Sequence, residues 1–161
     1  MTDDTGYGGL TGHVGIAISD EYILHTSGNE DEDAITLITI DNFINRYNDK
    51  NFIKVYRYED EHGDGPYYAK QAAKRAIRIY RDLRYKTTYK ITGDLTTLEP
   101  IYCSKYVLHS YYQASSHTVS SRVGDQIRNA TSGTYVLPYR IDNVLSSGYY
   151  DMDLVGYLYK D

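Results

Sequence analysis

The residues best suited to chemistry in this sequence are its single cysteine, Cys103, and two of its histidines, His13 and His25. A cysteine thiolate attacks carbonyl carbons and needs a neighbouring base to take up its proton. Imidazole supplies such a base near neutral pH. A second imidazole can hold the first in position, as the third member of a catalytic triad does. Together these three residue types predict nucleophilic chemistry on a carbonyl through a thioester.

Cys103 stands where a helix is expected to begin. Pro100 precedes it by three residues, and residues 102–114 have apolar side chains at helical spacing. The unpaired N–H groups and the dipole of a helix N-terminus favour an anion. We therefore expect the pKa of the Cys103 thiol to be lowered. The alternative is a small buried residue on a helix face, which is a common use of a free cysteine.

His13 and His25 are expected to meet at one end of a β-hairpin. Residues 13–19 and 22–26 are short apolar runs rich in β-branched residues, and residues 20–21 form the turn between them. In such a hairpin one histidine can orient the other. The alternative is two ordinary histidines at strand ends. A zinc site is disfavoured because no third ligand stands at motif spacing.

The remaining elements must position these residues. We expect strands at 35–40, 52–58, 135–137 and 153–159, a short helix at 42–48 with Asp41 as its N-cap, and a long amphipathic helix at 67–85. Residues 115–133 are polar and are expected to form a loop or lid. No internal repeat or domain boundary is visible, so the sequence predicts a single domain over residues 1–161.

Composition excludes several classes of protein. The 161 residues are 41% hydrophobic and 24% charged, and no stretch has the roughly 20 apolar residues that a membrane span needs. A net charge of −5 disfavours a nucleic-acid partner. The lysines and arginines of 70–90 follow a helical pattern typical of a solvated face. With one cysteine, no intrachain disulfide can form.

Tyrosine is the dominant aromatic residue, with 20 Tyr against 2 Phe and no Trp. The simpler interpretation is that Tyr occupies the aromatic core and strand positions. The alternative is an aromatic groove for sugars or peptides, because the ring has a flat apolar face and a polar tip.

Two segments resemble the catalytic motifs of a known group of enzymes. GHVGIAISDEYILHTSG, residues 12–28, resembles the first catalytic segment of the permuted NlpC/P60-like cysteine hydrolases, and YCSKYVLHSYYQAS, residues 102–115, resembles the second. The order with histidine first and cysteine last is the permuted one. The intervening IDNFINRYNDKNFIKVYRY and Ala-rich helix resemble the YiiX/YycO-like bacterial hydrolases in particular. The resemblance covers most of residues 9–115.

The resemblance implies an α+β, circularly permuted papain-like fold, with a small antiparallel sheet or partial barrel packed against helices. It implies Cys103 as the nucleophile, His13 as the general base and His25 as the residue that orients the base. It implies no cofactor and no metal. At the helix start the backbone N–H of Cys103 is the expected oxyanion donor. Tyr102 and Tyr7 are candidates for a second donor.

The implied activity is cleavage of an amide or peptide bond, with cell-wall peptidoglycan peptides as the expected substrates. His25 stands where the YiiX branch often has an acidic residue, and a histidine there is similar to the lecithin:retinol acyltransferase-like branch and to the unpermuted NlpC/P60 peptidases. Lipid-amide hydrolysis or acyl transfer is therefore an alternative, disfavoured by the polar segment 115–133. A binding module without catalysis is another, disfavoured because all three catalytic residue types are present.

The expected location is the cell exterior or envelope, as for the bacterial relatives of this fold. The polar, glycine-rich start of the chain has no recognisable signal peptide, so such a segment is expected to be absent from this chain. Only twelve residues precede His13, where the related families usually have a further Gly-Asp strand. A cytoplasmic location stays open.

Overall fold

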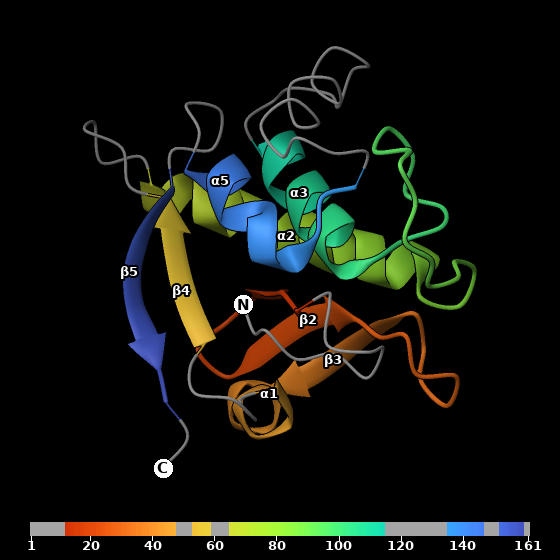
Figure 1. The fold of residues 1–161 in the computed structure, drawn as a ribbon, viewed down its shortest axis with the longest axis horizontal. Helices are drawn as coiled ribbons and strands as arrows, with labels where there is room; N and C mark the ends of the chain where they lie inside the picture. Colours follow the sequence, from red (N-terminus) through yellow and green to blue (C-terminus); the bar gives the residue numbers. More distant parts are fainter. Residues whose placement is uncertain (1–11, 48–52, 59–64, 115–134, 147–151, 160–161) are drawn as a thin grey trace.

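The computed structural model describes residues 12–47, 53–58, 65–114, 135–146 and 152–159. In chain order the elements are β1 (Gly15–Ala17), β2 (Tyr22–Thr26), β3 (Ile35–Thr39), α1 (Ile40–Tyr47), β4 (Ile53–Tyr58), α2 (Gly65–Leu83), α3 (Cys103–Ala114), η1 (Pro138–Arg140), α5 (Ile141–Leu145) and β5 (Met152–Leu158). They form an α+β arrangement with two small antiparallel sheets (Figure 1).

The first sheet has the order β1-β2-β3 and contains the predicted hairpin. β1 and β2 pair antiparallel with Gly15 opposite His25. The turn is closed by Ser19, whose hydroxyl oxygen accepts hydrogen bonds from the amides of Glu21 at 3.2 Å and Tyr22 at 3.0 Å. The prediction of a hairpin turning at residues 20–21 is confirmed.

The short helix α1 begins directly after β3. The amide of Asn42 donates to the hydroxyl of Thr39 at 3.2 Å, so Thr39 occupies the capping position. The prediction of Asp41 as the N-cap was wrong, because the helix begins at Ile40, two residues earlier than the sequence pattern indicated. Asp41 lies in the first turn, where its carboxylate complements the helix dipole.

The second sheet joins two strands that are far apart in the sequence. β4 pairs antiparallel with β5, and the register shifts between Val55 and Tyr56. Both strands were predicted to within one residue at each end, but their pairing depends on long-range packing. In Figure 1 this two-stranded ribbon lies to one side of α2, α3 and α5, with β2 and β3 of the other sheet below these helices.

The long helix α2 carries the predicted two-sided pattern. Ala72, Ala76 and Ile79 are buried, whereas Lys70 and Lys74 are exposed. The prediction of a solvated basic face is confirmed. None of the helices within the described ranges combines the length and the apolarity that crossing a membrane would require.

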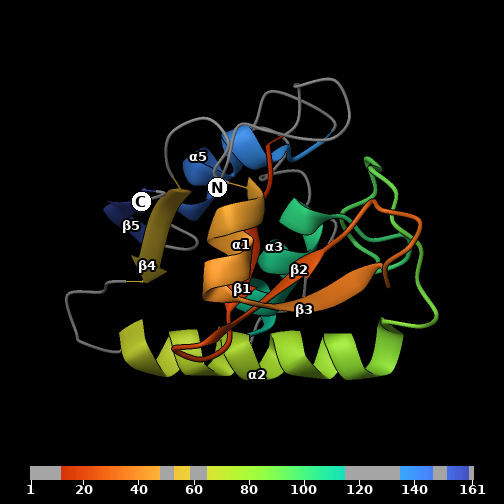
Figure 2. The ribbon, with the colours of Figure 1, turned by 90° about the horizontal axis from the view of Figure 1, so that it is seen from below.

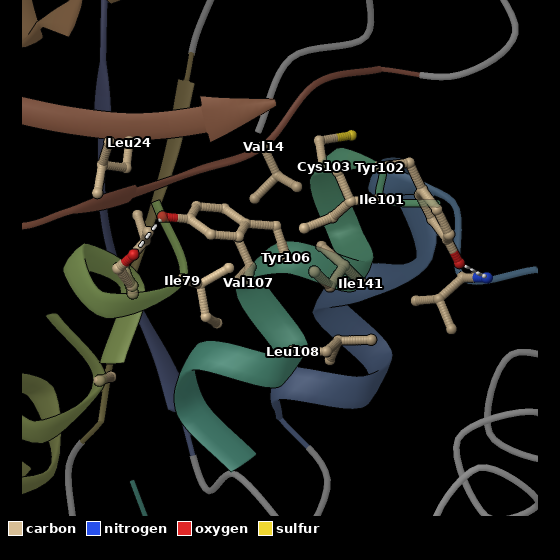
Figure 3. Close-up of a cluster of buried hydrophobic side chains, with 14 of the residues drawn as sticks. Val14, Leu24, Ile79, Ile101, Tyr102, Cys103, Tyr106, Val107, Leu108 and Ile141 are labelled. Carbon is tan, nitrogen blue, oxygen red and sulfur yellow. Dashed lines mark hydrogen bonds between the residues drawn. The ribbon is translucent and has the colours of Figure 1, made fainter. Parts of the chain in front are cut away.

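Helix α3 is the centre of the core. It packs against α2, and the hydroxyl of Tyr106 donates to the backbone carbonyl of Ala76 at 2.8 Å (Figure 3). All residues from 103 to 110 are buried. Figure 2 shows α3 and the three-stranded sheet on the same side of α2, and both pack against this helix.

Residues 135–137 do not form the predicted strand. Instead, Pro138 opens η1, and α5 follows it at once. Proline is favoured in the first turn of a helix because its missing N–H has no intrahelical partner there. Ile141 and Val144 of α5 are buried in the core. The predicted loop or lid at 115–133 lies outside the described residues.

Candidate functional site

Cys103 is the first residue of α3, as the sequence predicted. Its side chain is 2% exposed. The amide N–H groups of Val14 and Ser104 face the sulfur and stabilise its thiolate form. Figure 3 shows Cys103 beside Val14, the residue that follows His13. The hairpin and the helix start therefore meet at the sulfur.

The pKa of the Cys103 thiol differs from the sequence-based expectation. Burial raises this pKa to about 11, and the amides of Val14 and Ser104 offset only part of that rise. The expectation of a lowered pKa was wrong because desolvation of a fully buried anion outweighs the stabilisation that a helix N-terminus supplies. Cys103 is a neutral thiol at neutral pH.

His13 and His25 are in direct contact, as the hairpin predicted. Nε2 of His13 lies 3.0 Å from Nδ1 of His25, and both side chains are buried. Gly12 supplies the approach to this contact with a φ of 43°, in the left-handed region that glycine adopts without strain. The bond engages Nε2 of His13, so Nδ1 is the nitrogen of His13 that this bond leaves for proton exchange.

The tautomers of this pair decide whether His13 can act as a base. Base catalysis at Nδ1 of His13 requires its Nε2 to carry the hydrogen and donate it to Nδ1 of His25. His25 then carries its own hydrogen on Nε2, a buried atom for which the described residues supply no hydrogen-bond partner. In the other arrangement His25 carries its hydrogen on Nδ1, which lies 3.3 Å from the carbonyl oxygen of Thr26 and 3.0 Å from Nε2 of His13. Nε2 of His13 then holds the lone pair, and Nδ1 of His13 is protonated and cannot act as the base.

Both histidines are neutral at neutral pH. Burial lowers the pKa of His13 well below its ordinary value, and the neighbouring His25 lowers it further. Burial also lowers the pKa of His25 to about 4, although its contact with the Thr26 carbonyl favours the charged form. With Cys103 protonated as well, the resting site is a neutral thiol and a neutral imidazole rather than an ion pair.

Helix α1 covers the histidine pair with two aromatic rings. Tyr47 stacks on His13 with 4.1 Å between ring centroids and 19° between ring planes. The ring of Phe43, four residues earlier on the same helix, lies 5.7 Å from both histidine rings. A negative charge on Cys103 also helps to raise the pKa of Tyr47, which reaches about 12 mainly through burial. These two rings pack against both histidines and contribute to their burial.

Tyr89 is a site residue that the sequence analysis missed. Its hydroxyl is hydrogen bonded to the Cys103 side chain, and burial together with Cys103 raises its pKa above the ordinary value. The backbone on either side of Tyr89 makes two 3.0 Å hydrogen bonds with Ile101. Its ring packs on Gly28, where an added Cβ would lie 3.0 Å from a ring carbon. Among 20 tyrosines, no local signal distinguishes this one.

Tyr102 does not supply the second oxyanion donor that was considered for it. Its hydroxyl accepts a 3.4 Å hydrogen bond from the amide of Val136, and its ring is fully buried. Figure 3 shows its phenol directed away from the Cys103 sulfur. The other candidate, Tyr7, lies outside the described residues.

An ion pair between Arg46 and Glu32 lies close enough to His25 to affect its pKa. The guanidinium of Arg46 donates to the carboxylate of Glu32 at 2.6 Å. The carboxylate of Glu32 favours the charged form of His25, and Arg46 opposes it. Because the effects of Glu32 and Arg46 on the His25 pKa oppose each other, desolvation, which is the largest effect, sets the direction of the shift.

A third histidine of the described residues is structural. The ring Nε2–H of His109 donates to the carbonyl of Leu95 at 2.8 Å, and the side chain is buried. It is buried because the loop before α3, which contains Leu95, folds over this face of the helix. The parts of the chain with described coordinates contain no group of three or more His, Cys, Asp or Glu side chains that could hold a metal ion.

Comparison with known proteins places the chain in a family. The chain is 30% identical over 161 residues to a protein of Bacillus thuringiensis described as an uncharacterized 30.3 kDa protein. The match covers 92% of this chain and 52% of the relative, so the chain spans about half of that protein's length. No solved structure matches the chain. Residues 2–147 match the family described as lipoprotein N-acylation protein LnsA-like, within the papain-type group that includes the NlpC/P60-like and lecithin:retinol acyltransferase-like families. Over nearly its whole length, the chain belongs to this LnsA-like family.

Proposed function

We propose that this protein is a cysteine-dependent acyltransferase that takes an acyl group from an ester or amide onto Cys103 and passes it to an amine or to water. The observation that carries the proposal is the 3.0 Å contact of His13 with His25, next to the Val14 amide that faces the Cys103 sulfur. The family supports acyl transfer, and the three side chains match what that chemistry needs.

The first half-reaction begins from neutral groups. As the sulfur of Cys103 attacks the acyl carbon, its proton passes to Nδ1 of His13. The negative charge that develops on the acyl oxygen is stabilised by the backbone N–H of Cys103 and by the hydroxyl of Tyr89. The tetrahedral intermediate then collapses to a thioester, and the imidazolium of His13 returns its proton to the departing alcohol or amine.

The second half-reaction runs the same groups in reverse. His13 removes a proton from the incoming amine or water, which attacks the thioester carbon. Collapse of this second intermediate releases the acyl product, and the sulfur takes the proton back. Through both steps Nδ1 of His25 accepts a hydrogen bond from Nε2–H of His13. This bond orients the His13 ring and stabilises its transient positive charge.

The family also supports a more specific version of this proposal. Its description names lipoprotein N-acylation, so we propose an amine of a lipoprotein as acceptor and the cell envelope as the place of action. We also infer a circularly permuted papain-like fold, because the histidine hairpin precedes the cysteine helix in the chain.

The test uses a short ester, p-nitrophenyl butyrate, on the wild type and on Cys103→Ala. We expect nitrophenol release by the wild type and a butyryl adduct on Cys103 that hydroxylamine removes, detected by intact-protein mass spectrometry. Cys103→Ala should lose both signals. Equal turnover by the two proteins would contradict the proposal. Cleavage of a peptidoglycan stem peptide without ester turnover would replace it with the peptidase activity considered from the sequence.

A further inference from the structure

The imidazole of His25 has one ring nitrogen, Nε2, whose hydrogen decides which nitrogen of His13 can act as the base. Nε2 of His25 is buried and has no hydrogen-bond partner within the described ranges. The other nitrogen, Nδ1, lies 3.0 Å from Nε2 of His13. When the hydrogen of His25 is on Nε2, Nδ1 of His25 accepts from His13, and Nδ1 of His13 keeps its lone pair. A group that holds the hydrogen on Nε2 of His25 therefore selects the base.

The loop between β2 and β3 brings the carboxylate of Glu32 close to His25. Ser27 lies on the same side of the hairpin as His25, because alternate residues of a strand share a face, and its amide continues the strand pairing with a 3.1 Å hydrogen bond to the carbonyl of Ala34. The Ser27 side chain hydrogen bonds with the carboxylate of Glu32, and Glu32 acts electrostatically on His25. Oε2 of Glu32 is also buried without a hydrogen-bond partner in the described part of the chain.

The Glu32 carboxylate is charged and held in place. Arg46 of α1 donates to its other oxygen, Oε1, at 2.6 Å. Burial opposes ionisation of Glu32, but hydrogen bonds from Arg46 and Ser27 outweigh it and lower the pKa of the carboxyl below its ordinary value. A carboxylate oxygen only accepts hydrogen bonds. Oε2 is therefore an anionic acceptor at neutral pH, on the side of the hairpin where His25 has a buried nitrogen to satisfy.

The other described groups around His25 act elsewhere on its ring. His13 occupies Nδ1. The carbonyl of Thr26 lies 3.3 Å from Nδ1 as well, so it favours a hydrogen on the nitrogen that the mechanism needs as an acceptor. Tyr47 contacts the ring edge to face, with 5.6 Å between centroids. The carboxylate of Glu32 is the anionic group that acts on His25 among the residues with described coordinates.

We propose that Glu32 is a positioning residue, whose carboxylate attracts the hydrogen of the His25 ring to Nε2 and so leaves Nδ1 of His13 as the base. The inference rests on the proposed function, which it extends by a residue that acts only through His25. The hydrogen bond made by one nitrogen of an imidazole sets the role of the other nitrogen. The carboxylate exerts this effect through its charge or through one bridging water, since buried polar atoms without a protein partner bond to water.

The test determines the tautomer of His25 in the resting protein. Ring nitrogen-15 chemical shifts at pH 7 distinguish a hydrogen on Nε2 from a hydrogen on Nδ1. We expect the hydrogen on Nε2 in the wild type. In Glu32→Gln the carbonyl of Thr26 should draw it to Nδ1. The kcat for the butyrate ester should then fall by about tenfold or more with little change in KM, because the wrong tautomer removes the base.

Two further variants separate this role from a structural one. Arg46→Gln breaks the same ion pair, so a merely structural pair would make it resemble Glu32→Gln. We expect the opposite, because the two charges act on His25 in opposite directions. The pKa of His25 should rise in Arg46→Gln, with the hydrogen kept on Nε2, and fall in Glu32→Gln. Glu30→Gln makes the same change of charge at an exposed position of the same loop and should leave the tautomer and kcat unchanged.

A hydrogen on Nδ1 of His25 in the wild type, or an unchanged tautomer in Glu32→Gln, would overturn the inference. The same change in Glu32→Gln and Arg46→Gln would also overturn it, and thermal unfolding verifies that each variant is folded. The comparison with Cys103→Ala tests the acyl chemistry separately, since the tautomer measurement needs no substrate. A tautomer that changes in Glu32→Gln, in a wild type that does not turn over the ester, would contradict the proposed function and support the effect of Glu32 on His25.

Discussion

Nε2 of His13 lies 3.0 Å from Nδ1 of His25, and this contact leaves Nδ1 as the ring nitrogen of His13 that the proposed mechanism uses. The pair is neutral because both rings are buried. In the proposed mechanism His25 therefore acts on His13 through this hydrogen bond and not through a charge.

Replacing His25 tests the tautomer. In His25→Asn the amide oxygen stands near the position of Nδ1 and can accept only, which keeps the hydrogen on Nε2 of His13. We expect this variant to retain turnover of the butyrate ester within about tenfold of the wild type. His25→Leu cannot accept a hydrogen bond and should lose roughly a hundredfold or more. Equal loss in both variants would show that His25 does not act through this hydrogen bond.

Tyr89→Phe removes the hydroxyl that is hydrogen bonded to Cys103. If this hydroxyl stabilises the oxyanion, kcat for the ester should fall by about a hundredfold with little change in KM. The control is Tyr85→Phe, which removes a hydroxyl from a tyrosine that is 72% exposed and should leave kcat unchanged. A Tyr89→Phe enzyme with normal kcat would remove Tyr89 from the mechanism.

The reactivity of Cys103 should rise with pH over an unusually high range. Burial raises its pKa to about 11, so only about one thiol in ten thousand is ionised at pH 7. The rate of alkylation by iodoacetamide should still increase about tenfold per pH unit at pH 9. The rate for free cysteine, whose pKa is about 8.5, levels off at that pH. Cys103→Ser shows that the labelling is specific. A plateau below pH 7 would instead indicate a thiolate–imidazolium pair.

Stability should fall as the solution becomes acidic. His25 and His109 have folded-state pKa values of about 4, below the unfolded value of 6.5. Between these values the unfolded state binds more protons, so each histidine removes about 1.4 kcal/mol of stability per pH unit as the pH falls through this window. Above pH 6.5 this stability is fully present. Urea unfolding at pH 7 and pH 5 measures the loss.

His109→Gln isolates one of these contributions. The glutamine amide can still donate to the Leu95 carbonyl but does not titrate. Its stability should therefore decrease less than that of the wild type between pH 7 and pH 5. Identical pH dependence in the two proteins would mean that His109 does not have a lowered pKa.

Local sequence patterns determined the elements that carry the site. Short apolar runs rich in β-branched residues predicted the hairpin of His13 and His25, and helical spacing after Pro100 predicted that Cys103 opens a helix. These features were predictable because strand and helix periodicities and turn residues act over a few positions in the chain. The proximity of the histidines followed from the hairpin alone.

The tertiary structure decided the rest. It reversed the expected shift of the Cys103 pKa, because the depth of burial depends on what packs over a helix start. It placed Tyr89 at the Cys103 side chain and directed the hydroxyl of Tyr102 toward Val136. Which tyrosine lies at Cys103 depends on contacts between residues far apart in the sequence. The pairing of β4 with β5 likewise depends on long-range packing that no local pattern encodes.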